Sequence, residues 1–190
     1  MKITGEESDE KLMNAYAVSG DSHAFVFLYK RYEQRLFGYF ARRLFSGHQA
    51  QAGDLFQRTW LKVHESRDKF DPALRFSAWI FTIAQNLLRD YISSGHVRLS
   101  RQLHDQETVG SENVADDIEA GYFQKLEWDR VCSALAEVSD LQREAFLLSV
   151  WEGFTSKEIA QLLKVSDANA RQLVSRAKSA LKNLLEEARS

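Results

Sequence analysis

The sequence predicts an almost wholly helical protein made of two domains. One proline and nine glycines are spread over 190 residues, and no stretch alternates apolar and polar residues as a half-buried strand does. Apolar residues make up 44% of the chain, enough to bury a core in each domain. An acidic stretch with little helical periodicity, residues 95–122, separates the two helical parts. We therefore expect helical domains at 9–94 and 123–190, joined by an acidic linker.

The composition argues against several classes of protein. The single cysteine, Cys132, forbids an internal disulfide and a cysteine-based zinc site. The polar, acidic start is unlike a signal peptide, and no apolar run is long enough to span a membrane. The five histidines lack metal-ligand spacing, and no glycine-rich phosphate loop is present. We expect a cytoplasmic protein that is not an enzyme, does not bind membranes, and uses no metal or other cofactor.

The charge is unevenly distributed although the net charge is only −2. Residues 30–43 and 171–182 are basic, whereas residues 105–119 are acidic. This uneven distribution is more informative than the net charge, because basic segments favour contact with nucleic acid.

The first domain contains four predicted helices, at 9–18, 21–44, 51–66 and 77–92. The second of them carries aromatic and leucine side chains at helical spacing, which indicates a packed core. Its stripe consists of Phe25, Leu28, Tyr29, Tyr32, Leu36, Phe37 and Phe40.

The second domain ends in a predicted helix-turn-helix. A helix at 141–148 precedes a helix at 155–163 that opens with a capping box, Thr155 with Glu158. A tight turn then places Lys164 where many such units have glycine, and a long helix covers 167–185. The second helix of such a pair enters the DNA major groove. Its polar face carries side-chain types that bond phosphates and base edges, namely Asn169, Arg171, Gln172, Ser175, Arg176, Ser179 and Lys182.

Several segments in this order resemble a family, the bacterial RNA polymerase sigma factors. Residues 23–37, 54–63 and 76–91 look like the opening, the polymerase-binding helix and the promoter-melting segment of sigma domain two. Residues 142–148 and the helix-turn-helix look like domain four. With no domain between the two, the chain resembles the extracytoplasmic-function group. The resemblance implies that core RNA polymerase and promoter DNA are the partners, and that the acidic linker runs through the RNA exit path.

The resemblance also implies roles for particular residues. The face that binds the polymerase clamp would contain Asp54, Leu55, Gln57, Arg58, Trp60 and Leu61. Asn86 lies where the family reads a flipped base, and the neighbours that could assist it are Arg75, Phe76, Trp79, Arg89 and Arg98. Upstream-element recognition would fall to the polar face of the last helix. Trp79 is expected to be core more often than a DNA contact.

One segment departs from the family pattern. The clamp-binding helix usually opens with several acidic residues and has a glutamate after the glutamine, whereas here only Asp54 remains and Arg58 follows Gln57. The clamp surface is basic in the family, so this face should bind it weakly. We hypothesise that a serine/threonine kinase phosphorylates Thr59 and restores the missing negative charge. The alternative is that Thr59 is an ordinary helix residue and that an anti-sigma factor controls the protein.

Two other classes of protein remain open from the sequence. A stand-alone regulator could bind an operator through the helix-turn-helix, although no receiver domain precedes it. A helical adaptor that binds no DNA would leave the basic face of residues 169–182 unexplained.

Overall fold

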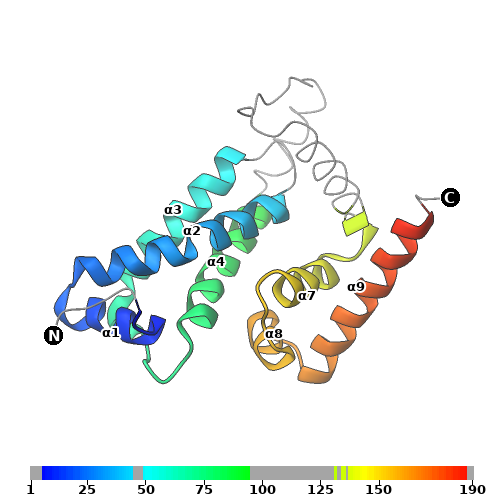
Figure 1. Cartoon of the computed structure of the whole chain (residues 1–190). Helices are drawn as coiled ribbons and strands as arrows, with labels where there is room; N and C mark the ends of the chain where they lie inside the picture. Colours follow the sequence, from blue (N-terminus) through cyan, green and yellow to red (C-terminus); the bar gives the residue numbers. More distant parts are fainter. Residues whose placement is uncertain (1–5, 45–48, 95–130, 132–133, 136, 188–190) are drawn as a thin grey trace. The chain divides into compact units, whose positions relative to one another are not determined.

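The computed structural model describes residues 6–44, 49–94, 131, 134–135 and 137–187, and every regular element in those ranges is helical (Figure 1). The chain divides into two compact units, residues 1–104 and 105–190. The predicted all-helical class with two domains is confirmed. The acidic linker at 95–122 lies outside the described residues and stays a prediction.

The first unit is a bundle in which each helix packs on the next along the chain, and α1 also contacts α4. Its elements agree with the predicted helices to within two residues at each end. They are α1 (Asp9–Ser19), α2 (Ser22–Leu44), α3 (Gln49–Glu65), the short 3-10 helix η1 (Arg67–Lys69) and α4 (Phe76–Ser93).

Aromatic side chains fill the space between α2 and α3. The Tyr29 ring lies 5.4 Å from Phe56 and 5.2 Å from Trp60, and Phe25 lies 5.3 Å from Trp60. Tilted and edge-to-face pairs of this kind add to the stabilisation that burial itself provides. The aromatic stripe predicted as core is buried or half-buried except for Phe37, which is 38% exposed.

The first turn of α1 fixes two other helices by hydrogen bonds. The Asp9 carboxylate accepts a hydrogen bond from the Tyr32 hydroxyl at 2.5 Å and forms an ion pair with Arg31, both on α2. Glu10 accepts a hydrogen bond from the Phe76 N–H at 3.0 Å, so a carboxylate of α1 caps the start of α4. Burial, together with the hydrogen bond to Asp9, raises the pKa of the Tyr32 phenol far above its ordinary value.

The second unit contains α7 (Asp140–Val150), α8 (Ser156–Leu163) and α9 (Asp167–Glu187), with α9 packed on both of the others. Ser139 and Gln142 form a capping box at α7, and Thr155 and Glu158 form the predicted one at α8. One core cluster joins residues before α7 to the two long helices. Its buried members are Ala134, Leu135, Val138, Leu147 and Leu181.

Candidate docking surface and nucleic-acid interface

The exposed side of α3 forms a narrow surface, which we call the docking face: Asp54, Gln57, Arg58 and Leu61. These positions recur at helical spacing and therefore point to the same side. Leu61 is 56% exposed, so an apolar side chain is accessible on this face. Arg58 lies 3.6 Å from Asp54, one turn away, so the one acidic residue of this face is paired with a neighbouring cation. Four of the six predicted docking residues are thus accessible to a partner.

The two other predicted docking residues, and Thr59 with them, lie on the opposite side of α3. Leu55 is 0% exposed and Trp60 is 4% exposed, so their side chains belong to the core and cannot form part of a surface for the clamp. The expectation that Thr59 adjoins the docking surface is also wrong, because Thr59 is 0% exposed and its hydroxyl donates to the Leu55 carbonyl at 2.8 Å. The reason is helical periodicity, which places residues 52, 55, 56, 59, 60 and 63 on one buried row.

Two predicted downstream-element residues lie together on α4. Asn86 and Arg89 are both exposed, and the Arg89 guanidinium donates to the Asn86 side-chain oxygen at 3.4 Å. Arg75 is exposed at the position before α4 begins. Gln85, the residue before Asn86, is buried, at 5% exposed. Arg98 lies outside the described residues.

Trp79, the residue whose role was divided between core and DNA, is half-buried. Its ring lies 5.2 Å from the Phe70 ring and 6.0 Å from the Phe76 ring. These contacts favour the core interpretation and hold the start of α4 against the segment that follows η1.

The helix-turn-helix has the predicted turn. Lys164 ends α8 in the left-handed conformation with φ of 56°, and among the described residues it alone has a positive φ without being glycine. Its N–H donates to the carbonyls of Ala160 and Gln161, and the Val165 N–H donates to Ala160 as well. This arrangement ends α8 abruptly, so α9 can start three residues later at a new angle.

Replacing Lys164 by glycine is expected to raise the free energy of unfolding of the second unit by about 0.5–1 kcal/mol. Glycine removes the steric cost of the left-handed backbone, and that gain exceeds its greater loss of freedom on folding. Urea unfolding followed by circular dichroism measures the difference. Glycine at Gln161, an exposed right-handed position of the same helix, should instead destabilise by about 1 kcal/mol. A loss of stability at both positions would contradict the argument.

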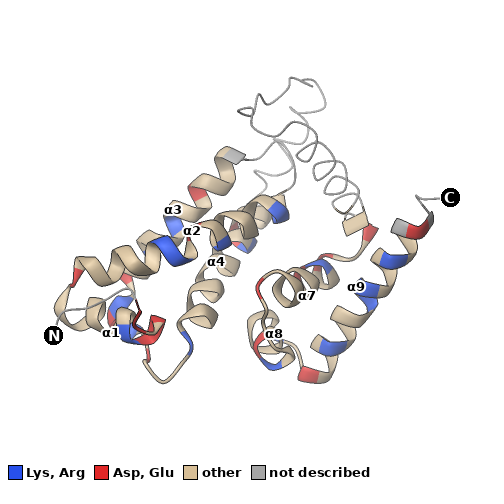
Figure 2. Ribbon diagram, in the orientation of Figure 1, with Lys and Arg blue, Asp and Glu red and all other residues tan. Residues whose placement is uncertain are grey.

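The exposed side of α9 forms what we call the recognition face: Asn169, Arg171, Gln172, Ser175 and Arg176. Lys and Arg recur along this helix (Figure 2). The Asp167 carboxylate lies 3.0 Å from the Arg171 guanidinium and so steadies that side chain at the start of the helix. Ser166 accepts a hydrogen bond from the Asn169 N–H at 3.2 Å and caps α9. Lys182 is exposed two turns further on, 3.8 Å from Glu186.

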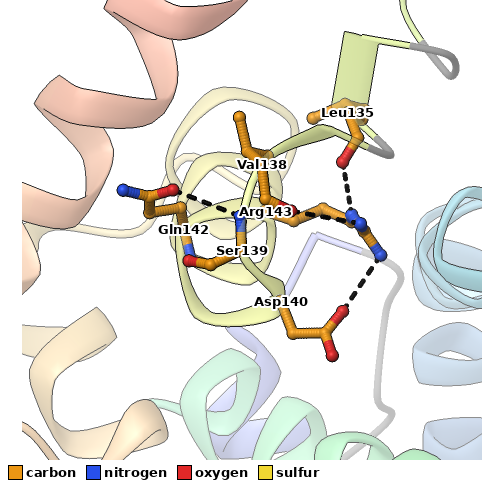
Figure 3. A network of polar contacts seen from close by, with 6 residues as sticks. All are labelled: Leu135, Val138, Ser139, Asp140, Gln142 and Arg143. Carbon is orange, nitrogen blue, oxygen red and sulfur yellow. Dashed lines mark hydrogen bonds and ion pairs between the residues drawn. The ribbon is translucent and has the colours of Figure 1, made fainter.

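A buried cation at the start of α7 was not anticipated as a structural residue (Figure 3). Arg143 is 7% exposed, and its Nε donates to the Leu135 carbonyl at 2.6 Å. Its Nη2 donates to the Val138 carbonyl at 3.3 Å, and its Nη1 lies 3.1 Å from Asp140. The guanidinium therefore joins the segment before α7 to α7 itself. The guanidinium thereby stabilises α7 and the segment before it, and α9 packs on α7.

The described residues hold no group of three or more histidine, cysteine, aspartate or glutamate side chains that could bind a metal ion. No helix in the described ranges is long and apolar enough to cross a membrane.

Comparison with known proteins agrees with the two-unit architecture. The Sigma-70 region 2 model matches residues 28–96, and the Sigma-70, region 4 model matches residues 129–181. The chain is 34% identical to the RNA polymerase sigma factor CarQ of Myxococcus xanthus, over 88% of this chain and 92% of that protein. It is 31% identical to the RNA polymerase sigma factor CnrH of Cupriavidus metallidurans, over 95% and 96% of the two chains.

Solved structures give the same picture. CnrH in complex with the cytosolic domain of CnrY matches with a TM-score of 0.70 and 27% identity, over 95% of this chain and 99% of that one. The sigma factor RpoE in complex with the anti-sigma factor NepR from Bartonella quintana matches with a TM-score of 0.57 and 29% identity, over 83% and 98%.

The two matched regions and the helix-turn-helix define a sigma factor of the Sigma-70 class, a non-enzymatic factor for initiating transcription. The chain belongs to the extracytoplasmic-function (ECF) RNA polymerase sigma factors, as the resemblance predicted. It directs transcription as a member of that family.

Proposed function

We propose that this ECF sigma factor binds core RNA polymerase through the docking face of α3 and contacts promoter DNA through both units. In this proposal Asn86 and Arg89 on α4 contact the separated downstream element. The recognition face of α9 reads the upstream element in the major groove. The proposed binding to core RNA polymerase is supported by the arrangement of α3, in which one row of residues is buried and another is exposed. The exposed row retains Asp54, Gln57, Arg58 and Leu61 for a partner.

The weak point of the docking face is its charge. The resemblance implies a basic clamp surface, and the paired Asp54 and Arg58 contribute no net negative charge at the middle of the face. Both side chains are about half exposed or more, so the pair itself is worth only a few tenths of a kcal/mol and opens easily. A partner that neutralises Arg58 or displaces it from Asp54 would therefore strengthen docking.

We also propose that an anti-sigma factor controls the protein, in preference to phosphorylation of Thr59. Two observations support this. CnrH and RpoE, which share this architecture, have been solved in complex with the cytosolic domain of CnrY and with NepR. The Thr59 hydroxyl is buried and bonded to the backbone, so a kinase could reach it only after α3 opened.

Replacing Arg58 by glutamate is expected to tighten binding to core RNA polymerase by roughly tenfold at low salt. The substitution changes the local charge by two units and frees Asp54 from its partner, and the gain should shrink as salt rises because the surface is exposed. Titration of the labelled full chain with core RNA polymerase measures the affinity. The matched control is glutamate at Lys69, an exposed lysine outside α3, which should leave the affinity nearly unchanged.

Two results would count against the docking proposal. If the wild-type chain and its Arg58→Glu variant both fail to bind core RNA polymerase, the operator-binding alternative is favoured. If Arg58→Glu weakens binding, Arg58 faces an acidic group on the polymerase and the assumed basic surface is wrong.

A further inference from the structure

A hollow in the second unit lies beside the recognition face, where α7, α8 and α9 meet. We call it the serine hollow. Its lining consists of Ser149, Ser156, Ile159, Arg171, Val174, Ser175, Lys178 and Ser179. Four hydroxyls and two cations thus come together from three helices. Of these residues, Arg171 and Ser175 belong to the recognition face, and Ser179 lies on the polar side of the same helix that the sequence predicted.

The polar groups of the serine hollow have unused hydrogen-bonding capacity. Within the described residues, no side-chain hydrogen bond or ion pair engages Lys178 or the hydroxyls of Ser149, Ser156 and Ser179. The other cation, Arg171, is held by Asp167 at 3.0 Å. Hydroxyl and ammonium donors that converge without partners suit an anion with several acceptor oxygens, because each oxygen can take up one or more of them.

Two further features favour an anion at this place. The lining also includes the buried Ile159 and the half-buried Val174, so the donors lie beside apolar side chains that do not compete for their hydrogen bonds. The start of α8 contributes Ser156, and the N-terminal end of a helix carries partial positive charge. The nearby Glu158 carboxylate is already engaged with the N–H and hydroxyl of Thr155.

The position of the hollow identifies the anion. Arg171 and Ser175 line both the serine hollow and the shallow depression over Asn169 and Gln172 on the recognition face. A duplex that places base edges against one side of these two residues brings its sugar–phosphate backbone to the other side. We propose that the serine hollow binds a backbone phosphate of duplex DNA. In this arrangement Lys178 supplies the charge, and the hydroxyls of Ser149, Ser156 and Ser179 supply hydrogen bonds. The inference rests on the proposed role of α9 in binding promoter DNA.

Salt dependence separates a phosphate contact from other effects. The affinity of the full chain for random-sequence duplex DNA is measured over a range of salt concentrations. Replacing Lys178 by glutamine should lower the affinity roughly three- to tenfold at low salt and reduce the slope of log K against log salt by about 0.9. Replacing Ser149, Ser156 and Ser179 together by alanine should lower the affinity and leave the slope unchanged, because neutral donors release no counterions.

The controls make the test specific. Lys178→Arg should keep the slope, and Lys62→Gln, the same charge change on α3, should leave both affinity and slope near those of the wild type. An unchanged slope in Lys178→Gln, or no wild-type binding to the duplex at low salt, would overturn the phosphate site. Correct slopes in a chain that does not bind core RNA polymerase would leave the phosphate site standing and reject the proposed docking instead.

Discussion

Replacing Thr59 by glutamate is expected to lower the free energy of unfolding of the first unit by about 3–5 kcal/mol. The Thr59 side chain is 0% exposed, and its hydroxyl bonds only within its own helix, to the Leu55 carbonyl at 2.8 Å. A glutamate there would place a longer side chain and a carboxylate on the buried row that Thr59 shares with Leu55, Phe56 and Val63, and a buried charge without an ion-pair partner is costly. Urea unfolding of the full chain, followed by circular dichroism, measures the loss.

The control is valine at the same position. Thr59→Val keeps the shape and removes a hydroxyl whose bond is local, so stability should change by less than about 1 kcal/mol. Transcription from a target promoter should be unchanged. If Thr59→Glu is instead stable and raises transcription while Thr59→Val abolishes it, then α3 opens to expose this residue. The phosphorylation hypothesis would then replace control by an anti-sigma factor.

The case of α3 shows what the sequence could and could not predict. Its helical period and bounds follow from apolar spacing alone. The docking residues were instead predicted from their positions in a family motif. Consecutive residues of a motif lie on different sides of a helix, so not all of them can face a partner. Leu55 and Trp60 therefore entered the predicted site although they face the core. Applying the same period to the motif would have separated the buried row from the docking face.

The helix-turn-helix was predicted more completely because its signals are local. The Thr155–Glu158 box and the strained Lys164 turn each depend on a few consecutive residues. The serine hollow could not be found in this way, because Ser149, Ser156 and Lys178 belong to three different helices. Their convergence depends on how α7, α8 and α9 cross, and helical periodicity does not fix the crossing.

The structural role of the buried Arg143 could not be predicted from the sequence for the same reason. In the sequence it stands in a charged, exposed-looking run with Gln142 and Glu144. Its partners are the Leu135 and Val138 carbonyls, main-chain groups that carry no signature in the sequence. Only the fold brings these groups to one guanidinium.

Replacing Arg143 by methionine is therefore expected to lower the free energy of unfolding of the second unit by about 2–4 kcal/mol. Methionine fills much of the same space but leaves the two carbonyls without their donor, and an unsatisfied buried carbonyl costs about 1–3 kcal/mol. Leu135 and Val138 share a core cluster with Leu147 and Leu181, so the loss should loosen the packing of α9. Urea unfolding measures the change in stability, and hydrogen exchange along α9 locates it.

Two companion variants define the cause. Arg143→Lys keeps the charge but lacks the planar fork that reaches both carbonyls and Asp140, so it should recover less than half of the lost stability. Arg176→Met removes an exposed arginine of the same unit and should change stability by no more than about 0.5 kcal/mol. If Arg143→Met unfolds like the wild type, the guanidinium makes no net contribution to the free energy of unfolding of the second unit. The orientation of α9 then depends on apolar packing alone.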